Sequence, residues 1–257
     1  MIAVITGAAA GLGAELARQL QPHYQLVLID RDPLDLERLG LDSERIVMSL
    51  QSDLSDPDQI AGMLRQLEQL ERLDLLINNA GITHRSRAEV TDLTVIQRVM
   101  QVDYFAPVQL TQGVLPLLRD SQGLIVNMSS MAGWMPVLGR AGYCAAKAAL
   151  HQYFETLRSE VAAQGIAVLM VYPSFVATQI EQNALGADGG RAQHARSVVG
   201  KVSQAEDLVE AIVRAIGKRQ QRLFPDRFTY FSSLLYRVAP KFYHRLMRKR
   251  FAEELMI

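Results

Sequence analysis

Six short apolar runs, each of a length that suits a buried strand, recur along the chain. The runs are 2–6, 25–29, 45–50, 73–78, 124–129 and 166–172. Between them lie longer segments in which apolar residues return every three or four positions, as in 12–20, 60–73 and 141–163. Strands and helices that alternate in this way predict a three-layer, doubly wound α/β fold, in which a parallel sheet carries helices on both faces.

Composition limits the class of protein. The chain has 257 residues, 49% of them hydrophobic, and its 27 basic and 27 acidic side chains balance, which suits one α/β domain and argues against nucleic acid as the main partner. Cys144 is the only cysteine, so we expect no disulfide, no thiolate metal site and a reducing, cytoplasmic compartment. The first apolar run is too short for a signal segment, so we expect neither a leader nor a membrane span before the fold.

A glycine-rich turn follows the first predicted strand. The stretch TGAAAGLG contains Gly7, Gly11 and Gly13 and leads into a helix that we expect to begin near Leu12. Glycines let the backbone approach a ligand closely, and the unpaired N–H groups of a helix N-terminus can bind a pyrophosphate. The spacing is GxxxGxG rather than GxGxxG, and turns of this kind also use glycine without any ligand, so the turn alone is a weak signal.

Asp30 ends the second predicted strand, where an acidic residue can accept hydrogen bonds from both hydroxyls of an adenosine ribose. Its charge would repel the extra phosphate of NADP, and the alanines at 8–10 offer that phosphate no partner, which favours NAD. Arg31 argues the other way, because a guanidinium there could hold the phosphate. Asp53 and the stretch NNAG at 78–81 also follow strands, where ligands of parallel sheets collect, although Asp and Asn are common turn formers too.

A serine, a tyrosine and a lysine follow the fifth predicted strand. Tyr143 and Lys147 are four positions apart and share a helix face, with only small residues between them. An adjacent ammonium and a cationic nicotinamide would both favour the phenolate. In a hydride transfer, Tyr143 would give or take the hydroxyl proton while Ser130 donates a hydrogen bond to the oxygen. Taken alone, such a pair is also common on solvated helix surfaces.

The motifs TGAAAGLG, NNAG, NMSS and YCAAK, in this order and at these spacings, resemble the short-chain dehydrogenases/reductases over residues 1–225. The resemblance implies one Rossmann domain with about seven strands. It also implies NAD(P)-dependent interconversion of an alcohol and a ketone or aldehyde, with Tyr143 as acid/base, Ser130 positioning the substrate oxygen and Lys147 also bound to the nicotinamide ribose. The implied assembly is a homodimer or homotetramer formed through the helices at 91–118 and 141–164.

The expected site residues follow from these motifs. YPSFVAT at 172–178 resembles the family's PGxxxT, with Ser174 replacing the usual glycine, and implies contacts to the nicotinamide amide. The expected catalytic residues are Ser130, Tyr143, Lys147 and Asp103. The expected cofactor site, for NAD or NADP, consists of Gly7, Gly11, Leu12, Gly13, Asp30, Arg31, Asp53, Leu54, Asn79, Ala80, Gly81, Tyr143, Lys147, Pro173, Val176 and Thr178.

Asp103 stands where the family usually has an asparagine, which holds a water that links to the lysine in a proton relay. Aspartate has nearly the same shape and can still accept hydrogen bonds, but it lacks the amide donors. Two outcomes are open. The carboxylate serves as a relay base, or it pairs with Lys147 and weakens the effect of the lysine charge on Tyr143.

Two segments bear on the substrate. Residues 174–200 are rich in glycine and lack a sustained apolar period, which predicts a lid or a simple surface connection. Several apolar side chains of this segment and of 131–142 could line a substrate pocket: Trp134, Met135, Val137, Leu138, Phe175, Ile180 and Leu185. A pocket of this kind favours a hydrophobic alcohol or carbonyl, although core packing explains the same residues nearly as well.

The C-terminal segment, 226–257, is basic and amphipathic. No acidic residue occurs between 237 and 250, and Pro240 predicts a break between two short helices. Such a helix can lie on an anionic membrane surface, giving peripheral contact through 228–257, or pack its apolar side against the domain or a second subunit. The rival to an enzyme is a cofactor-binding sensor or scaffold that uses this tail; Asp103 favours it, whereas the presence of Ser130, Tyr143 and Lys147 together favours the enzyme.

Overall fold

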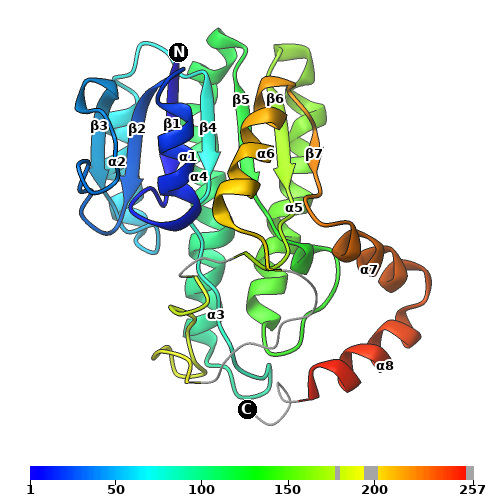
Figure 1. Ribbon diagram of the computed structural model, residues 1–257. Helices are drawn as coiled ribbons and strands as arrows, with labels where there is room; N and C mark the ends of the chain where they lie inside the picture. Colours follow the sequence, from blue (N-terminus) through cyan, green and yellow to red (C-terminus); the bar gives the residue numbers. More distant parts are fainter. Residues whose placement is uncertain (177–179, 194–201, 253–257) are drawn as a thin grey trace.

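In the computed structural model, which describes residues 1–176, 180–193 and 202–252, seven strands form one sheet in the order β3-β2-β1-β4-β5-β6-β7 (Figure 1). Every neighbouring pair is parallel. The strands are β1 (Ile2–Thr6), β2 (Gln25–Asp30), β3 (Ile46–Gln51), β4 (Leu75–Asn78), β5 (Leu124–Met128), β6 (Ala167–Val171) and β7 (Arg222–Leu223). The predicted doubly wound fold is therefore confirmed. The edge strand β7 has only two residues, and no apolar run in the sequence predicted it.

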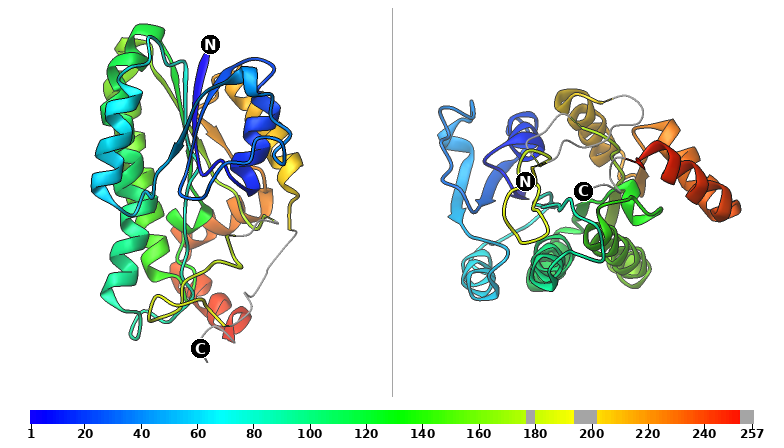
Figure 2. Two further views of the ribbon diagram at one scale, coloured as in Figure 1. Left: turned by 90° about the vertical axis from the view of Figure 1, so that its left-hand side faces the viewer. Right: turned by 90° about the horizontal axis from the view of Figure 1, so that it is seen from below.

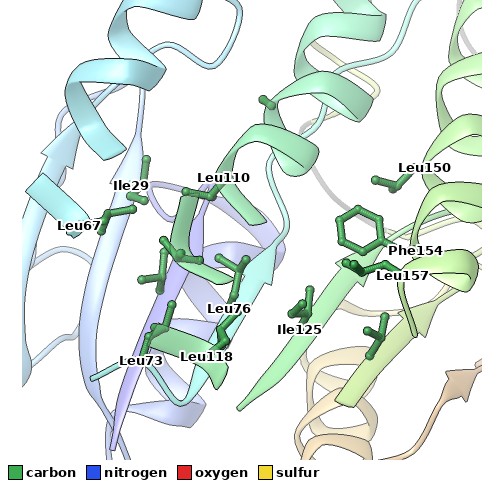
Figure 3. Packing of buried hydrophobic residues seen from close by; sticks show 14 of the residues in the cluster. Ile29, Leu67, Leu73, Leu76, Leu110, Leu118, Ile125, Leu150, Phe154 and Leu157 are labelled. Carbon is green, nitrogen blue, oxygen red and sulfur yellow. The ribbon is translucent and has the colours of Figure 1, made fainter. Parts of the chain in front are cut away.

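Helices cover both faces of the sheet, as the two views in Figure 2 show. One face carries α1 (Gly11–Leu20) and α6 (Ala205–Gly217). The other carries α2 (Pro57–Leu67), α4 (Ala106–Ser121) and α5 (Ala141–Val161). On this second face, Leu110 and Phe154 pack with Ile125 of the sheet in a continuous apolar core (Figure 3). Each such side chain stabilises the fold by roughly 1.5–3 kcal/mol through its burial.

The helix before β5 contains an irregularity. α3 (Leu93–Met100) continues through a π-helical segment, Gln101–Phe105, directly into α4. A π-turn inserts one extra residue into the helix and often occurs at functional sites. In this protein it carries the fully buried Asp103.

Two segments at the carboxyl ends of the strands lie outside the layers. The described residues of 174–200 have turns and isolated bridges instead of helices or strands, and Leu185 pairs with His84. After β7 come α7 (Arg227–Val238) and α8 (Pro240–Arg250), separated at the position that Pro240 predicts. Within the described residues, no helix combines the length and apolar character needed to cross a membrane.

Candidate active site

The glycine turn between β1 and α1 depends on glycine at each of its three positions. Gly7 and Gly11 have φ of 69° and 57°, values that side chains with a Cβ rarely adopt. A Cβ at Gly13 would lie 1.9 Å from the carbonyl oxygen of Gly7. The N-cap of α1, Ala10, has no side-chain hydrogen bond, and the first intrahelical bond runs from Ala14 N to the carbonyl oxygen of Ala10. The N–H groups at the start of α1 are therefore well placed for an anion.

Asp30 lies at the end of β2 beside this turn. Its Oδ2 accepts a hydrogen bond from Ala9 N at 2.8 Å, and its Oδ1 accepts one from Asp32 N at 3.0 Å. The carboxylate thus fixes the turn and still lines the cavity described below. Arg31 lines the same cavity, is exposed, and lies 3.7 Å from the Asp32 carboxylate through its Nε.

The end of β4 is tied to the end of β1. Thr6 Oγ1 accepts hydrogen bonds from the main-chain N–H groups of Asn79 and Ala80, both at 3.0 Å. Asn79 Nδ2 in turn donates to the carbonyl oxygen of Thr6 at 2.9 Å. Asn79 therefore holds the glycine turn in place as well as lining the cavity, and Asp53, after β3, lines it too.

Lys147 and Asp103 form a buried ion pair. Lys147 Nζ lies 3.2 Å from Asp103 Oδ2 and donates to the carbonyl oxygen of Met128 at 2.9 Å. Asp103 Oδ1 accepts from Ile82 N at 2.8 Å. Burial acts to lower the pKa of Lys147, but the carboxylate of Asp103 and the phenol of Tyr143 outweigh it and raise that pKa. The structure thus has Asp103 paired directly with Lys147, and its role as a relay base stays a prediction.

Tyr143 stands next to this pair, with its ring centre 5.7 Å from Lys147 Nζ. Burial raises the pKa of Tyr143, and the negative charge of Asp103 adds to the rise. Lys147 and a hydrogen bond with Ser130 act in the opposite direction but do not reverse it. The expected shift toward phenolate is thus absent in the protein alone, chiefly because burial disfavours the charged phenolate, and secondarily because Asp103 offsets part of the effect of the lysine charge.

His84, which the sequence reasoning missed, caps the helix that carries Tyr143. Its Nε2 accepts a hydrogen bond from Gly142 N at 2.9 Å, so its proton is on Nδ1, which lies 3.1 Å from Ser86 Oγ. The chain continues to Thr91 Oγ1 at 2.7 Å, whose hydroxyl donates to a main-chain carbonyl. Burial, reinforced by the charge of Arg140, lowers the pKa of His84 to about 4.

Glu181 of the 174–200 segment is fastened to the domain by two arginines. Arg140 donates from both terminal nitrogens to the two carboxylate oxygens at 2.8 Å each, and Arg85 NH2 donates to Oε2 at 2.7 Å. All three side chains are at least 84% buried, because their exposed fractions are 10%, 4% and 16% for Arg140, Arg85 and Glu181. This cluster, which we call the Glu181 clamp, holds the segment against the cavity and gives it the position of a lid.

One cavity of about 360 Å³ brings these features together. Its lining includes the glycine turn, the residues at the ends of β2, β3 and β4, and Tyr143 with Lys147. The expected residues that line it are Gly7, Gly11, Leu12, Asp30, Arg31, Asp53, Leu54, Asn79, Ala80, Gly81, Ser130, Tyr143, Lys147, Pro173 and Val176. Gly13 and Asp103 do not line the cavity: Gly13 packs against Gly7, and Asp103 pairs with Lys147. Thr178 lies outside the described residues.

The expected apolar wall is only partly present. Met135, Val137, Phe175 and Ile180 line the cavity. Trp134 instead packs in an aromatic cluster with its ring 5.2 Å from that of Tyr172, and Leu138 packs beneath α8. Core packing therefore explains Trp134 and Leu138, and Leu185 forms bridges with His84 and Arg191 instead of lining the cavity. The other four leave an apolar surface in the cavity that contains Tyr143.

The missed residues carried weak sequence signals. His84 and Arg85 lie in ITHRS, directly after the NNAG stretch, and Arg140 lies three positions before Tyr143. A histidine with an arginine beside it, close to a strand end, was the available signal. Glu181 could not be linked to them, because the partners are 96 and 41 positions away.

The sequence and the fold are similar to those of known proteins. The family model described as short chain dehydrogenase matches residues 1–189. A curated relative, dehydrogenase/reductase SDR family member 7B of Bos taurus, is 33% identical over 98% of this chain and 82% of its own length. Among solved structures, a short-chain dehydrogenase from Sphingobium yanoikuyae in complex with NADPH is 28% identical, covers 91% of both chains and has a TM-score of 0.78. A 4-hydroxyisoleucine dehydrogenase complexed with NADH is 25% identical over 85% of this chain and 92% of its own, with a TM-score of 0.70.

Proposed function

The chain belongs to the short-chain dehydrogenase family of oxidoreductases, and from this we propose that it interconverts an apolar alcohol and the corresponding ketone or aldehyde, with Tyr143 as the proton donor and acceptor. The observation that carries the proposal is the placement of Ser130, Tyr143 and Lys147 on one wall of the cavity that begins at the glycine turn. A phenol and a hydroxyl that face the same space can share one substrate oxygen.

The residues of the turn fit a nicotinamide dinucleotide. The uncapped start of α1 suits a pyrophosphate, and the missing side chains at Gly7, Gly11 and Gly13 let it approach the backbone. Asp30 suits a ribose, and Asn79 to Gly81 extend the site toward Lys147. A cofactor bound there supplies or accepts the hydride.

Side chains of the protein transfer the proton and stabilise the charge that remains. In the direction of carbonyl reduction, Tyr143 donates its phenolic proton to the substrate oxygen, and Ser130 donates a hydrogen bond to the same oxygen. Lys147, whose Nζ lies 5.7 Å from the ring centre of Tyr143, stabilises the resulting phenolate through its positive charge. Asp103 keeps Lys147 protonated in its buried position, because it raises the pKa of the ammonium.

The substrate class rests on the lining near Tyr143. Met135, Val137, Phe175 and Ile180 present apolar surface there, and the lid that bears Ile180 is anchored by the Glu181 clamp. An aliphatic or aromatic carbonyl buries its carbon skeleton against these side chains, whereas a sugar or a small acid would leave its polar groups unpaired. A graded series of aliphatic ketones assayed with NADH tests this: kcat/KM rises with chain length, and a flat or falling series would refute the apolar pocket.

For the cofactor, we favour NAD over NADP because Asp30 places a carboxylate where a 2′-phosphate would lie. One similar structure is a complex with NADPH and another a complex with NADH, so relatives of both kinds exist. Calorimetric titration of the protein with NADH and NADPH tests the preference. We expect tighter binding of NADH, and in Asp30→Asn a loss of that preference by about tenfold, which corresponds to about 1.4 kcal/mol. Tighter NADPH binding by the unmodified protein would mean that Arg31 outweighs Asp30.

A second function, a cofactor-binding sensor with little turnover, is favoured by the Lys147–Asp103 pair, because the carboxylate offsets the charge that activates Tyr143. The two functions differ in one result. A sensor binds NADH with no turnover on any member of the ketone series, whereas the dehydrogenase turns over the longer members.

A further inference from the structure

The C-terminal helices pack beside the active site through one side of the part that the structure describes. Tyr243, Met247 and Phe251 are buried against Met135, Leu138 and Tyr236. Tyr243 Oη also donates to the carbonyl oxygen of Pro136 at 2.9 Å. The helices are therefore fixed to the segment that follows Ser130 and supplies part of the cavity wall.

Their other side is apolar and exposed. Phe231, Val238, Phe242 and Leu246 are 58%, 84%, 52% and 42% exposed. On α8 they are accompanied by exposed basic residues, with no acidic residue between 237 and 250: Lys241, Arg245, Arg248, Lys249 and Arg250. We call these nine residues the outer tail face; Arg237 is not among them, because its guanidinium lies 4.3 Å from the ring centre of Trp134. Phe242, Arg245, Leu246 and Lys249 follow the spacing i, i+3, i+4, i+7, so apolar and basic side chains share one side of α8.

We propose that the outer tail face binds the surface of an anionic lipid bilayer. A helix with half-exposed apolar side chains and flanking Lys and Arg lies in the interface, with the apolar side chains among the acyl boundary and the basic ones at the headgroups. The described helices cannot span a bilayer, which makes the contact peripheral.

Charge decides between lipid and a second copy of the chain as the occupant. The formal net charge of the whole chain is zero, so the excess of positive charge in the tail is matched by acidic excess elsewhere. A two-fold dimer through the outer tail face would bring the same basic residues of two copies together, which costs electrostatic energy. An anionic bilayer complements that charge, at about 1 kcal/mol per basic residue near the surface.

The position of α8 gives the contact a consequence for the substrate. In both side views α8 lies beyond the carboxyl ends of the strands, at the same end of the molecule as the lid (Figures 1 and 2). The segment beneath α8 also contributes Met135 and Val137 to the cavity. A bilayer held there lies next to the site, so an apolar substrate dissolved in it has a short path; this part rests on the proposed function.

Vesicle co-sedimentation of the full chain, without substrate, tests the lipid contact independently of activity. We expect the protein to pellet with vesicles of phosphatidylcholine and phosphatidylserine and to remain in the supernatant with phosphatidylcholine alone. The triple variant Arg245→Gln/Arg248→Gln/Lys249→Gln lowers the partition coefficient on the order of a hundredfold. A matched control, Arg38→Gln/Arg65→Gln/Lys218→Gln, removes three exposed basic residues elsewhere and leaves it unchanged.

A second pair of variants tests the apolar part. Phe242→Ser/Leu246→Ser weakens vesicle binding, whereas Leu93→Ser, at a residue that is 66% exposed on α3, does not. Circular dichroism melting checks that each variant is folded. Three results overturn the proposal: no binding to the anionic vesicles, equal binding by the triple variant and its control, or a loss of self-association in Phe242→Ser/Leu246→Ser with vesicle binding unchanged. The last would make the outer tail face an interface between copies.

Discussion

The ion pair between Asp103 and Lys147 is built for a carboxylate, and Asp103→Asn should therefore destabilise this protein. Two donors face the side chain: Ile82 N at 2.8 Å from Oδ1 and Lys147 Nζ at 3.2 Å from Oδ2. An aspartate accepts the hydrogen bond from Ile82 N and pairs through its charge with Lys147, whereas an asparagine has one acceptor and must turn its NH₂ toward one of the two groups. Either orientation leaves two donors facing each other in a buried site.

The size of the effect follows from the distance. Two unit charges 3.2 Å apart attract by about 5 kcal/mol at an effective dielectric constant of about 20. The desolvation of both groups offsets part of this, and removing one partner of a buried pair usually costs about 3–5 kcal/mol. Because the amide keeps one hydrogen bond, we expect a loss of about 3 kcal/mol in the free energy of unfolding, together with a lower pKa for Lys147.

Urea unfolding at neutral pH measures this. Glu210→Gln is the matched control, since Glu210 pairs with Arg214 on an exposed helix surface and its loss should change stability by less than about 0.5 kcal/mol. The double variant Asp103→Leu/Lys147→Met, which removes both charges, should be more stable than Asp103→Asn. A free energy of unfolding for Asp103→Asn within about 0.5 kcal/mol of that of the parent would refute the reasoning, because the buried pair would then contribute no more than a surface pair.

Three further predictions concern the helix cap, the lid and the glycine turn. Since the pKa of His84 is lowered to about 4 from 6.5, the folded state binds fewer protons than the unfolded state between these values, so this part of the stability is present above pH 6.5 and is lost as the pH falls. The loss totals about 3 kcal/mol. His84→Gln should abolish this pH dependence of the free energy of unfolding, measured with urea across that range, whereas His23→Gln, at an exposed residue, should keep it. Glu181→Gln removes charge and an acceptor from the Glu181 clamp, so hydrogen exchange of Leu185 N should accelerate by about tenfold or more; unchanged protection would show that the clamp does not hold the lid. Gly13→Ala places a methyl group 1.9 Å from Gly7 O, so calorimetry should find NADH binding abolished, whereas Gly217→Ala, which meets nothing within 4 Å, should bind NADH normally.

The sheet could be predicted because most residues of β1, β2, β4, β5 and β6 are buried, while the edge strand β3, which is exposed at alternate positions, still has an apolar run. The first six strands are continuous apolar runs, and the predicted bounds of β1 are those of the structure. β7 could not be predicted, since it has only Arg222 and Leu223 and lies at the edge of the sheet. The helix expected over 60–73 ends at Leu67, because the next residues form turns in which Gln69 N and Leu70 N bond to residues three positions back.

The site was predictable where its residues sit at strand ends or share a helix face. The glycine turn, Asp30 and the Tyr143–Lys147 spacing are local patterns of that kind. The direct contact between Asp103 and Lys147 depends on a π-turn, for which the sequence has no clear signal, and on a separation of 44 positions. The Glu181 clamp joins residues that only the folded chain brings together. The expected assembly and the domain boundary at 225 stay predictions.

The exchange of Tyr143 for phenylalanine tests most directly whether this cavity performs proton-coupled hydride transfer. Turnover of the best ketone with NADH and the dissociation constant of NADH are measured in the same preparation, with Tyr153→Phe, on the same helix, as the control. We expect Tyr143→Phe to lose turnover by a factor of about 10²–10⁴ or more while NADH binds as in the parent, since only the proton donor is removed. Turnover in Tyr143→Phe equal to that of the parent would contradict the assignment of the proton to Tyr143, and with it the dehydrogenase mechanism.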